Sequence, residues 1–247
     1  MRITILGSGS AIPVPERAQN GILLERDKGD QTPILIDCGS GILHKLTHLS
    51  VGLENIRTIF LTHHHLDHMS DLLPLITARW LVGHTETSIY GPEGTEKLIK
   101  NLLDLYEYVK QHVTVQVTEL KNGSVTEVEG MRVECLQTVH TTQNLAYRFD
   151  HKVVISGDTE PFEKMSEFAK GCKLLIHECS FPDGFKVVKH TTPAKLGEVL
   201  KDCDVDTLVL THLYPPMESK EREIIESVHK HFKGKVIVAR DLACFEV

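Results

Sequence analysis

Short apolar runs alternate with helical periodicities along the first half of the chain. Four of these runs predict β-strands, at residues 2–6, 21–25, 33–37 and 57–62. Apolar residues then recur at helical spacing from Leu72 to Leu81, and an amphipathic pattern follows from Glu96 to Lys110. Both of these segments are therefore predicted to be helices.

The second half repeats this theme. It begins with four short strands joined by tight turns, predicted at residues 125–129, 131–139, 145–149 and 152–156. Helices predicted at 161–170, 192–200 and 218–232 then alternate with strands at 173–177, 206–211 and 235–239. Such a pattern is satisfied by two central sheets with helices outside, an α/β sandwich of four αββα layers. Because no linker rich in Pro, Gly or Ser separates the halves, we expect one domain over residues 1–247, built of two similar halves.

The composition is that of an ordinary globular protein, with 41% hydrophobic and 25% charged residues among 247. The formal net charge of −7 argues against a broadly basic surface that holds nucleic acid through its phosphates. No stretch approaches the roughly 20 apolar residues that a membrane span requires, and the first apolar run is too short for a signal peptide. We therefore expect a cytoplasmic protein without membrane contact, whose six cysteines are mostly small buried residues.

Histidine is the residue type that stands out. Four of the 15 histidines lie in one segment, Thr62-His63-His64-His65-Leu66-Asp67-His68. Side chains two apart on an extended chain point the same way, so His63 and His65 should share one side, and a turn should bring Asp67 and His68 nearby. Imidazole and carboxylate are good ligands for ions such as zinc, so this segment predicts a two-metal site. A solvated polar loop is the alternative, which the position directly after an apolar strand disfavours.

Three further candidates stand directly after predicted strands of the second half. They are His140, Asp158 and His212. A sheet gathers side chains at the edge where its strands end, so these residues are expected to complete the two-metal site. For each residue alone a structural role is the alternative, which their joint presence with the histidine-rich segment disfavours.

The pattern His-x-His-x-Asp-His at 63–68 resembles that of the metallo-β-lactamase superfamily. Other segments, in the same order along the chain, are similar to the ribonuclease Z group of that superfamily: Leu6-Gly7-Ser8-Gly9-Ser10-Ala11-Ile12-Pro13, Arg17, Ile36-Asp37-Cys38-Gly39, Tyr90-Gly91-Pro92-Glu93-Gly94, Ser156-Gly157-Asp158-Thr159, His177-Glu178 and Leu210-Thr211-His212. These landmarks span nearly the whole chain. The resemblance implies the metallo-β-lactamase fold and a metal-dependent hydrolase that acts on ester bonds.

The resemblance also implies how the metal ligands are shared. One ion would be held by His63, His65 and His140, the second by Asp67, His68 and His212, and both by a bridging Asp158. A carboxylate between two cations about 3.5–4 Å apart offsets their repulsion, and two ions lower the pKa of a shared water, so that a bridging hydroxide forms near neutral pH. Zinc fits these ligands best, with manganese or iron as the alternatives.

Two residues are expected to take part in the reaction itself. In the implied mechanism the bridging hydroxide attacks the ester, and Asp67 orients that hydroxide or accepts its proton. His190, in His190-Thr191-Thr192-Pro193, is the candidate acid for the leaving alkoxide, at a place where ribonuclease Z-like proteins carry His-Ser-Thr. A position just before a helix N-terminus should lower the pKa of His190, and Glu178 could counter this effect and orient the ring. An ordinary loop histidine is the alternative.

The match departs from ribonuclease Z in one respect. That enzyme grips tRNA with a long arm, which in bacterial forms lies between the third metal histidine and the bridging aspartate, whereas His140 and Asp158 are only eighteen positions apart. The missing arm favours a phosphodiesterase acting on small or cyclic phosphodiesters. The alternatives are a ribonuclease Z-type endonuclease that processes the 3′ end of tRNA, a lactone or ester hydrolase or arylsulfatase, and a non-catalytic metal-binding module. The resemblance further implies a homodimer.

Overall fold

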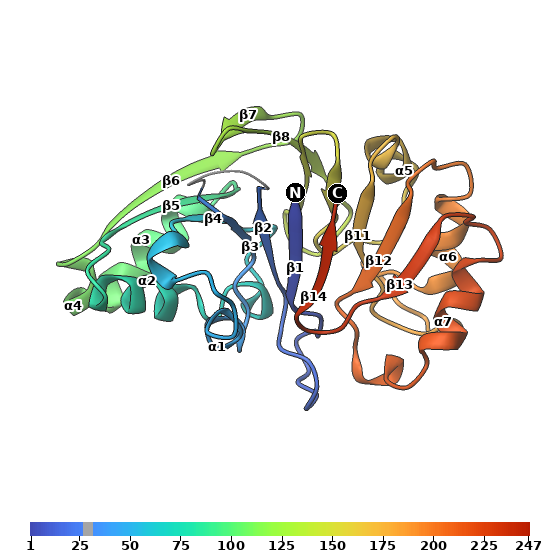
Figure 1. The fold of residues 1–247 in the computed structure, drawn as a ribbon, viewed down its shortest axis with the longest axis horizontal. Coiled ribbons are helices and arrows are strands. Elements are labelled where there is room, and N and C mark those ends of the chain that lie inside the picture. The colour runs from blue at the N-terminus through green and yellow to red at the C-terminus, as the bar shows by residue number, and fades with distance from the viewer. Residues whose placement is uncertain (27–31) are drawn as a thin grey trace.

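Two seven-stranded sheets lie face to face at the centre of the molecule, and helices cover their outer sides (Figure 1). In this computed structural model, residues 1–26 and 32–247 are described. The strand order is β14-β1-β2-β3-β4-β5-β6 in the first sheet and β13-β12-β11-β10-β9-β8-β7 in the second. Each sheet is mixed, with antiparallel pairs in one part and parallel pairs in the other.

The first sheet is built almost entirely from the first half of the chain. Its strands are β1 (Arg2–Gly7), β2 (Gly21–Glu25), β3 (Ile34–Ile36), β4 (Thr58–Phe60), β5 (Glu86–Pro92), β6 (Thr114–Leu120) and β14 (Ala243–Glu246). Its helices are α1 (Ile42–Leu46), α2 (Leu72–Leu81), α3 (Thr95–Leu105) and α4 (Glu107–Lys110). β3, β4, β5 and β6 run parallel, so their carboxyl ends lie at one edge.

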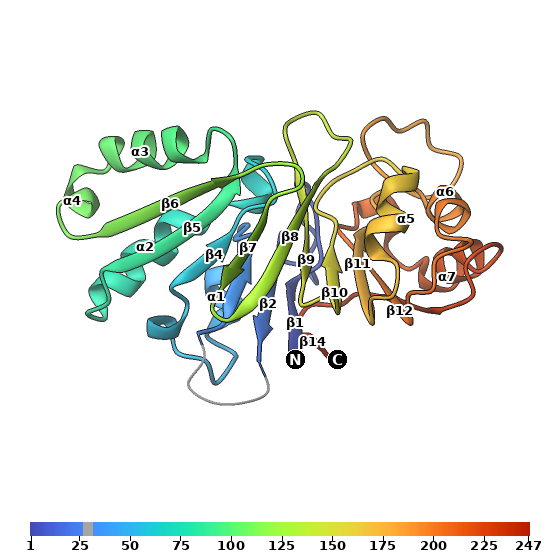
Figure 2. The same ribbon diagram turned by 90° about the horizontal axis from the view of Figure 1, so that it is seen from above.

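The second sheet comes from the second half. Its strands are β7 (Val125–Val128), β8 (Met131–Gln137), β9 (Leu145–Phe149), β10 (Val153–Ile155), β11 (Leu174–Glu178), β12 (Thr207–Thr211) and β13 (Lys235–Val238). Its helices are α5 (Glu163–Ala169), α6 (Pro193–Val199) and α7 (Glu221–Val228). Viewed from above, α5, α6 and α7 lie at one end of the molecule and α2, α3 and α4 at the other (Figure 2).

Three clusters of buried apolar side chains hold these layers together. The central cluster joins the two sheets, with Ile3 and Phe60 from the first and Tyr147 and Val209 from the second. A second cluster packs the second sheet against α5, α6 and α7, and a third packs the first sheet against α1, α2 and α3. Burial of apolar surface on both faces of each sheet is the main stabilising contribution. The predicted four-layer αββα sandwich is confirmed.

Several element boundaries differ from the sequence prediction. The helix predicted from Glu96 to Lys110 is interrupted at Tyr106, whose φ of −118° and ψ of 65° separate α3 from α4. The helix predicted over 218–232 is shorter in the structure. The chain leaves the 3₁₀ turn Pro215–Met217 only just before this segment, and α7 begins at Glu221. β5, β6, α1 and β14 were not predicted: α1 and β14 are short, β6 has many exposed positions, and β5 begins with three polar residues.

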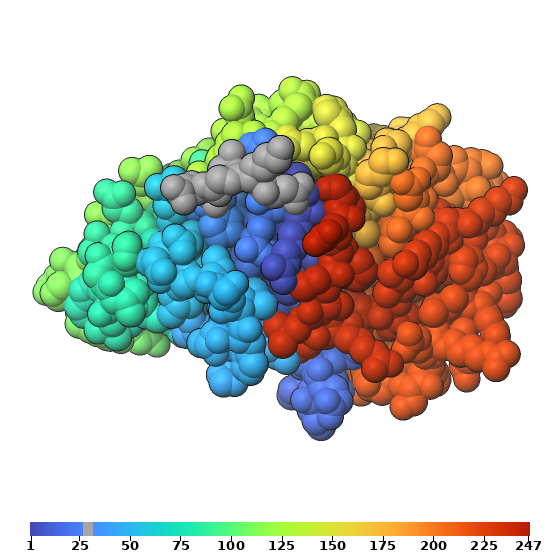
Figure 3. Space-filling model, in the orientation of Figure 1, coloured from blue at the N-terminus to red at the C-terminus, as the bar shows by residue number. Residues whose placement is uncertain are grey.

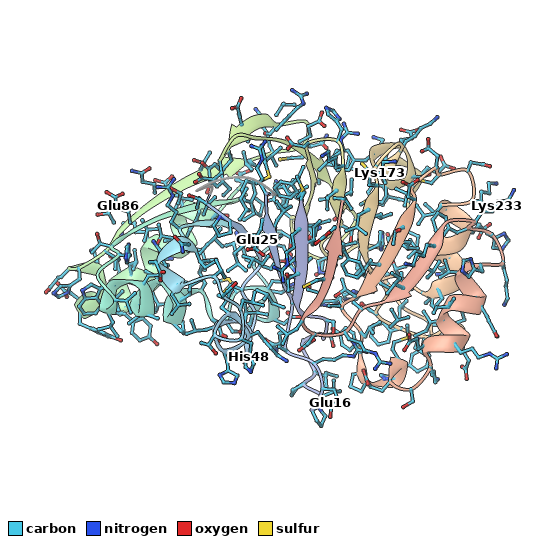
Figure 4. All side chains as sticks on the ribbon, in the orientation of Figure 1. Glu16, Glu25, His48, Glu86, Lys173 and Lys233 are labelled. Atoms are coloured by element: carbon cyan, nitrogen blue, oxygen red, sulfur yellow. The ribbon has the colours of Figure 1, made fainter. Side chains whose placement is uncertain are left out.

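Charged residues lie around the periphery of the molecule. Glu16 is at the tip of the loop after β1, and Glu86 and Lys233 lie at opposite ends (Figure 4). β1 and β14 pair antiparallel, and the two ends of the chain, dark blue and red, lie next to each other in the space-filling view (Figure 3). Of the six cysteines, four are buried, Cys203 is partly buried and Cys244 is exposed. Among residues 1–26 and 32–247, no helix has the length and apolar character needed to cross a membrane.

Candidate metal centre

The segment after β4 turns sharply and folds back on itself. His63 is fully buried, and the 3₁₀ turn Leu66–His68, in which Asp67 and His68 are buried, begins three residues later. Gly39 makes room for this turn, because a Cβ at that position would lie 2.0 Å from the carbonyl oxygen of Asp67. The structure therefore contains the turn that the sequence predicted.

The second sheet supplies the other three predicted residues from the ends of separate strands. His140 lies after β8, Asp158 after β10 and His212 directly after β12. Before Asp158 the chain adopts a left-handed conformation at Gly157, with a φ of 59°, where a Cβ would lie 2.6 Å from the Asn144 side chain. The seven predicted residues thus converge from both sheets, although four come from one loop and three from distant strands.

Direct hydrogen bonds join the two sheets at this point. The N–H of Leu145 in β9 donates to the carbonyl of Thr62, at 3.0 Å. The buried hydroxyl of Tyr147 donates to the carbonyl of Leu61, at 2.6 Å. The segment that leads into the histidine-rich loop is therefore held by both sheets.

One group of candidate ligand atoms comes from His63, His65, His140 and Asp158, all within 4.8 Å of one another. Nε2 of His140 lies 3.3 Å from Nδ1 of His65 and 3.8 Å from Oδ2 of Asp158. A tetrahedral ion with bonds of ~2.1 Å keeps its ligand atoms roughly 3.4 Å apart, so the observed spacing suits a zinc-sized cation.

The second group is formed by Asp67, His68 and His212, whose ligand atoms also lie within 4.8 Å of one another. Oδ2 of Asp67 is 3.2 Å from Nε2 of His212 and 3.8 Å from Nε2 of His68. Asp158 reaches this group too, since its Oδ1 is 3.4 Å from Nε2 of His68 and its Oδ2 is 3.4 Å from Nε2 of His212. One carboxylate therefore faces both groups.

Some of these ligand atoms are buried without a hydrogen-bond partner among the described residues. They are His63 Nε2, His68 Nε2 and Asp158 Oδ1. An unpaired buried polar atom costs about 1–3 kcal/mol, so such atoms in native proteins usually face an ion, a ligand or a water. Burial also lowers the pKa of His63, His65 and His140, so these imidazoles are neutral near pH 7 and offer a lone pair to a cation. The residues present therefore fit divalent metal ions.

His190 lies beside the second group. Its ligand atom is within 4.8 Å of those of Asp158 and His212. Its Nδ1 donates to Oε1 of Glu178, at 2.9 Å, and that carboxylate is buried at the end of β11. Burial opposes the charged ring, but the Glu178 carboxylate outweighs it, and the pKa of His190 is raised. The N-terminus of α6 was expected to lower the pKa of His190, but the effect of Glu178 is larger. α6 is short and begins three residues after His190, so its influence on the ring is weak.

Four histidines of the centre present Nε2 to the ligand groups, and each of them makes a hydrogen bond through its other ring nitrogen, Nδ1. The partners, with their distances, are Thr62 Oγ1 for His63 (3.1 Å), Asp37 Oδ2 for His68 (2.7 Å), the Lys189 carbonyl for His140 (2.9 Å) and Ser180 Oγ for His212 (3.0 Å). Such partners fix the orientation of a ligand ring and the nitrogen that it presents to the metal. Sequence reasoning did not assign this role to any of these four residues.

Asp37 is the strongest of these partners. Its carboxylate is fully buried and also accepts hydrogen bonds from the backbone and hydroxyl of Thr62 and from Nδ2 of Asn20, each at 2.8 Å. Asp37 lies directly after β3, with a φ of 59° in the left-handed region. A signal for it existed, because Asp37 follows one parallel strand as His63 follows the next.

The remaining histidines lie outside the three groups of candidate ligand atoms that the described residues form. His177 is buried, and its Nδ1 donates to the carbonyl of Glu178 at 2.7 Å. His64 shares a hydrogen bond with Thr95 Oγ1 at 2.8 Å, at the start of α3. The other seven are exposed: His44, His48, His84, His112, His151, His229 and His231.

Known proteins match this chain in sequence and in overall structure. A ribonuclease Z of Methanosarcina acetivorans is 28% identical over an alignment 304 residues long, which covers the whole of this chain and 98% of that relative. The metallo-β-lactamase fold protein YhfI of Bacillus subtilis superposes with a TM-score of 0.86 at 25% identity, covering 100% of this chain and 98% of YhfI. The short form of human tRNase Z superposes with a TM-score of 0.77 at 22% identity, covering 100% and 99%.

The fold, the paired ligand groups and these relatives define a metal-dependent hydrolase of the metallo-β-lactamase fold, similar to ribonuclease Z. The resemblance stated from the sequence is thereby confirmed. Within that class the match is more specific. Residues 1–232 match the family of the anti-Pycsar protein Apyc1, and the chain belongs to this family.

Proposed function

We propose that the protein is a phosphodiesterase that cleaves small or cyclic phosphodiesters with the help of two divalent metal ions, zinc in the first place. The observation that carries the proposal is the position of the His190–Glu178 pair beside two ligand groups that share Asp158. Such a site combines a place for two cations with a proton donor for an alkoxide, which is what hydrolysis of a phosphodiester requires.

The proposal gives each residue of the centre a role. His63, His65 and His140 would hold one ion, Asp67, His68 and His212 the other, and Asp158 both. When bound, two such ions supply Lewis acidity and lower the pKa of a water molecule. Asp67 contacts His68 and His212 through Oδ2, so its Oδ1 is the atom that we assign to orienting the attacking water and accepting its proton.

His190 would donate the proton that the leaving oxygen requires. Its Nδ1 is engaged by Glu178, so Nε2 is the nitrogen that faces the substrate. The His190 side chain is 17% exposed and that of Glu178 is 1% exposed. The ring of His190 can therefore contact a bound ester, while the Glu178 carboxylate remains shielded from solvent. Glu178 favours the protonated ring, which suits an acid that acts near neutral pH.

Several observations support a small substrate. Between His140 and Asp158 the chain forms only β9, a turn and β10, which leaves no room for a protruding arm. The alignment with the M. acetivorans relative spans 304 residues and this chain has 247, so parts of that relative have no counterpart here. Because the chain belongs to the family of the anti-Pycsar protein Apyc1, we also propose that it counteracts a Pycsar system.

A substrate panel on protein of defined metal content tests the proposal. Cyclic nucleotides, an aryl phosphodiester, a lactone and a precursor tRNA are incubated with wild type and with the Asp67→Ala variant. We expect turnover of the small phosphodiesters by the wild type alone. Cleavage of the precursor tRNA at its 3′ end but not of small phosphodiesters would instead establish the endonuclease, and cleavage of the lactone alone would establish an ester hydrolase. For the anti-Pycsar role, expression of wild type but not of Asp67→Ala should relieve the effect of a Pycsar system in cells that carry one.

A further inference from the structure

Three aromatic rings form a stack beside the candidate metal centre. The ring centroids of Phe181 and Tyr214 are 4.5 Å apart with planes inclined by 24°, and those of Phe181 and Phe185 are 5.9 Å apart with planes inclined by 22°. The inner end of the stack reaches the centre, because the Tyr214 ring lies 5.7 Å from that of His212 and 5.8 Å from that of His190. The stack is therefore continuous with the groups proposed to act on the ester.

The outer end of the stack is open to solvent. Phe185 is 49% exposed, and it lies in a segment between β11 and α6 that forms neither helix nor strand. The solvent-facing side of the Phe185 ring is therefore free to pack against a bound group, at the end of an ordered stack that begins beside the candidate centre.

The loop between β11 and α6, which carries two of the three rings, is held by hydrogen bonds. Asp183 accepts a hydrogen bond from the N–H of Ala194 at 2.9 Å and another from the Ser227 hydroxyl, which ties the loop to α6 and α7. The N–H of Phe181 donates to the carbonyl of Thr191 at 3.3 Å. A surface held in this way is preformed, so a ligand that packs on it does not have to order the loop.

We propose that this stack is the surface on which the nucleobase of a nucleotide substrate packs, an inference that rests on the phosphodiesterase function proposed above. Phe181 lies 6.0 Å from the His190 ring, centroid to centroid, so a ring system attached to an ester held at His190 meets the stack next. Every nucleobase has a π-face, and stacking on aromatic side chains is tolerant of base identity. The structure thereby favours a nucleotide over a simple alkyl phosphodiester.

Binding of two product-like probes tests this inference without turnover. Adenosine 5′-monophosphate and ribose 5-phosphate carry the same phosphate and sugar and differ in the base. We expect metal-loaded wild type to bind the nucleotide more tightly by calorimetry. Phe185→Ala should weaken nucleotide binding by about 5- to 100-fold, the usual worth of one base stacked on an aromatic ring, and leave ribose 5-phosphate unchanged. Phe185→Trp should retain the preference. Leu105→Ala, which alters a side chain 77% exposed on α3, serves as the matched control.

Three results would overturn the inference. Equal affinity of wild type for both probes, or an equal loss for both in Phe185→Ala, would show that the stack does not recognise a base. A change in sedimentation of Phe185→Ala with an unchanged affinity ratio would assign the ring to an interface between copies of the chain. If wild type cleaves phosphodiesters but Phe185→Ala leaves the ratio of the affinities for the two probes unchanged, only this inference fails. If wild type neither cleaves phosphodiesters nor binds the nucleotide, the proposed function fails as well.

Discussion

The two candidate ligand groups of the centre differ in charge and in what supports them. The first contributes three histidines, backed at His63 and His140 by a hydroxyl and a carbonyl. The second contains the carboxylate of Asp67, and one of its histidines is backed by the fully buried carboxylate of Asp37. Asp158 is common to both. The second group therefore places more negative charge around its cation than the first.

This difference indicates how the two positions would differ in metal binding. A carboxylate behind a ligand imidazole makes the ring more basic and strengthens its bond to a cation, whereas a neutral oxygen mainly fixes its orientation. We therefore expect the second position to depend on anionic residues and the first on ring geometry. Substitutions that change one group and spare the other can break or sharpen this contrast.

The largest effect is expected for Asp67→Ala. The second group loses a ligand and the reaction loses its proposed proton acceptor, so phosphodiester turnover should fall by about 10⁴-fold or more. Elemental analysis should show about one ion per chain, retained by the first group, while circular dichroism shows an intact fold. Retention of two ions with normal turnover would contradict the proposed ligand sharing.

His190→Ala should leave both groups intact and slow only the step that needs an acid. For alkoxide leaving groups the rate should fall by ~10²–10⁴-fold, the usual worth of general acid catalysis. For a nitrophenyl ester, whose leaving group needs no proton, the rate should change little. Rates on a series of esters, together with metal content, measure both effects. A uniform loss across the series would remove His190 from this role.

Asp37→Asn should weaken the second position more than the first, because Asp37 contacts His68 directly and reaches His63 only through the Thr62 hydroxyl. Loss of the carboxylate behind a ligand histidine typically lowers metal affinity by about 10–100-fold, which chelator competition can measure for each ion. Ser180→Ala is the matched comparison, because it removes a neutral partner from His212 in the same group, and its effect should be smaller. If both ions were lost equally from Asp37→Asn, the contrast in charge between the two groups would not govern binding.

The smallest effect is expected for Asp104→Asn, which changes a carboxylate of α3 outside the ligand groups that pairs with Lys100 and Lys110 on the surface. These hydrogen bonds lower the pKa of Asp104 to about 2. A lowered pKa stabilises the folded state above the ordinary pKa of aspartate, and that contribution disappears as the pH falls through about 2. Metal content and turnover should be unchanged, and any difference in unfolding between wild type and variant should vanish in strong acid. An effect on metal content would show coupling that the structure does not contain.

The sequence indicated the residues of the centre better than it indicated what holds them. The residues His63 to His68 are adjacent in the chain and follow a strongly apolar strand, so a local pattern was sufficient to predict their turn. His140 and His212 could be proposed because each ends a strand. Asp37 and Ser180 were not assigned, because each partner lies about 30 positions along the chain, after the neighbouring parallel strand, and only the pairing of these strands brings them into contact.

The fold, too, was predicted well where the local sequence pattern is strong and poorly where it is weak. Buried strands such as β12 are continuous apolar runs and were predicted closely. β6 alternates exposed and partly buried positions at the edge of the first sheet, where the apolar signal is weak, and it was not predicted. The break at Tyr106 has no proline or glycine to mark it, so the amphipathic pattern predicted one continuous helix.

The hydrogen bonds from Leu145 and Tyr147 to the segment before the histidine-rich loop have a consequence for assembly of the molecule. Neither ligand group is complete within one sheet, so a chain in which only one sheet has folded cannot offer a finished site for a cation. Cations that bind only the finished arrangement stabilise the docking of the two sheets by mass action. Bound metal ions would then hold the two sheets of the sandwich together. Removal of the ions should loosen the contact between the sheets, on which the proposed hydrolysis depends.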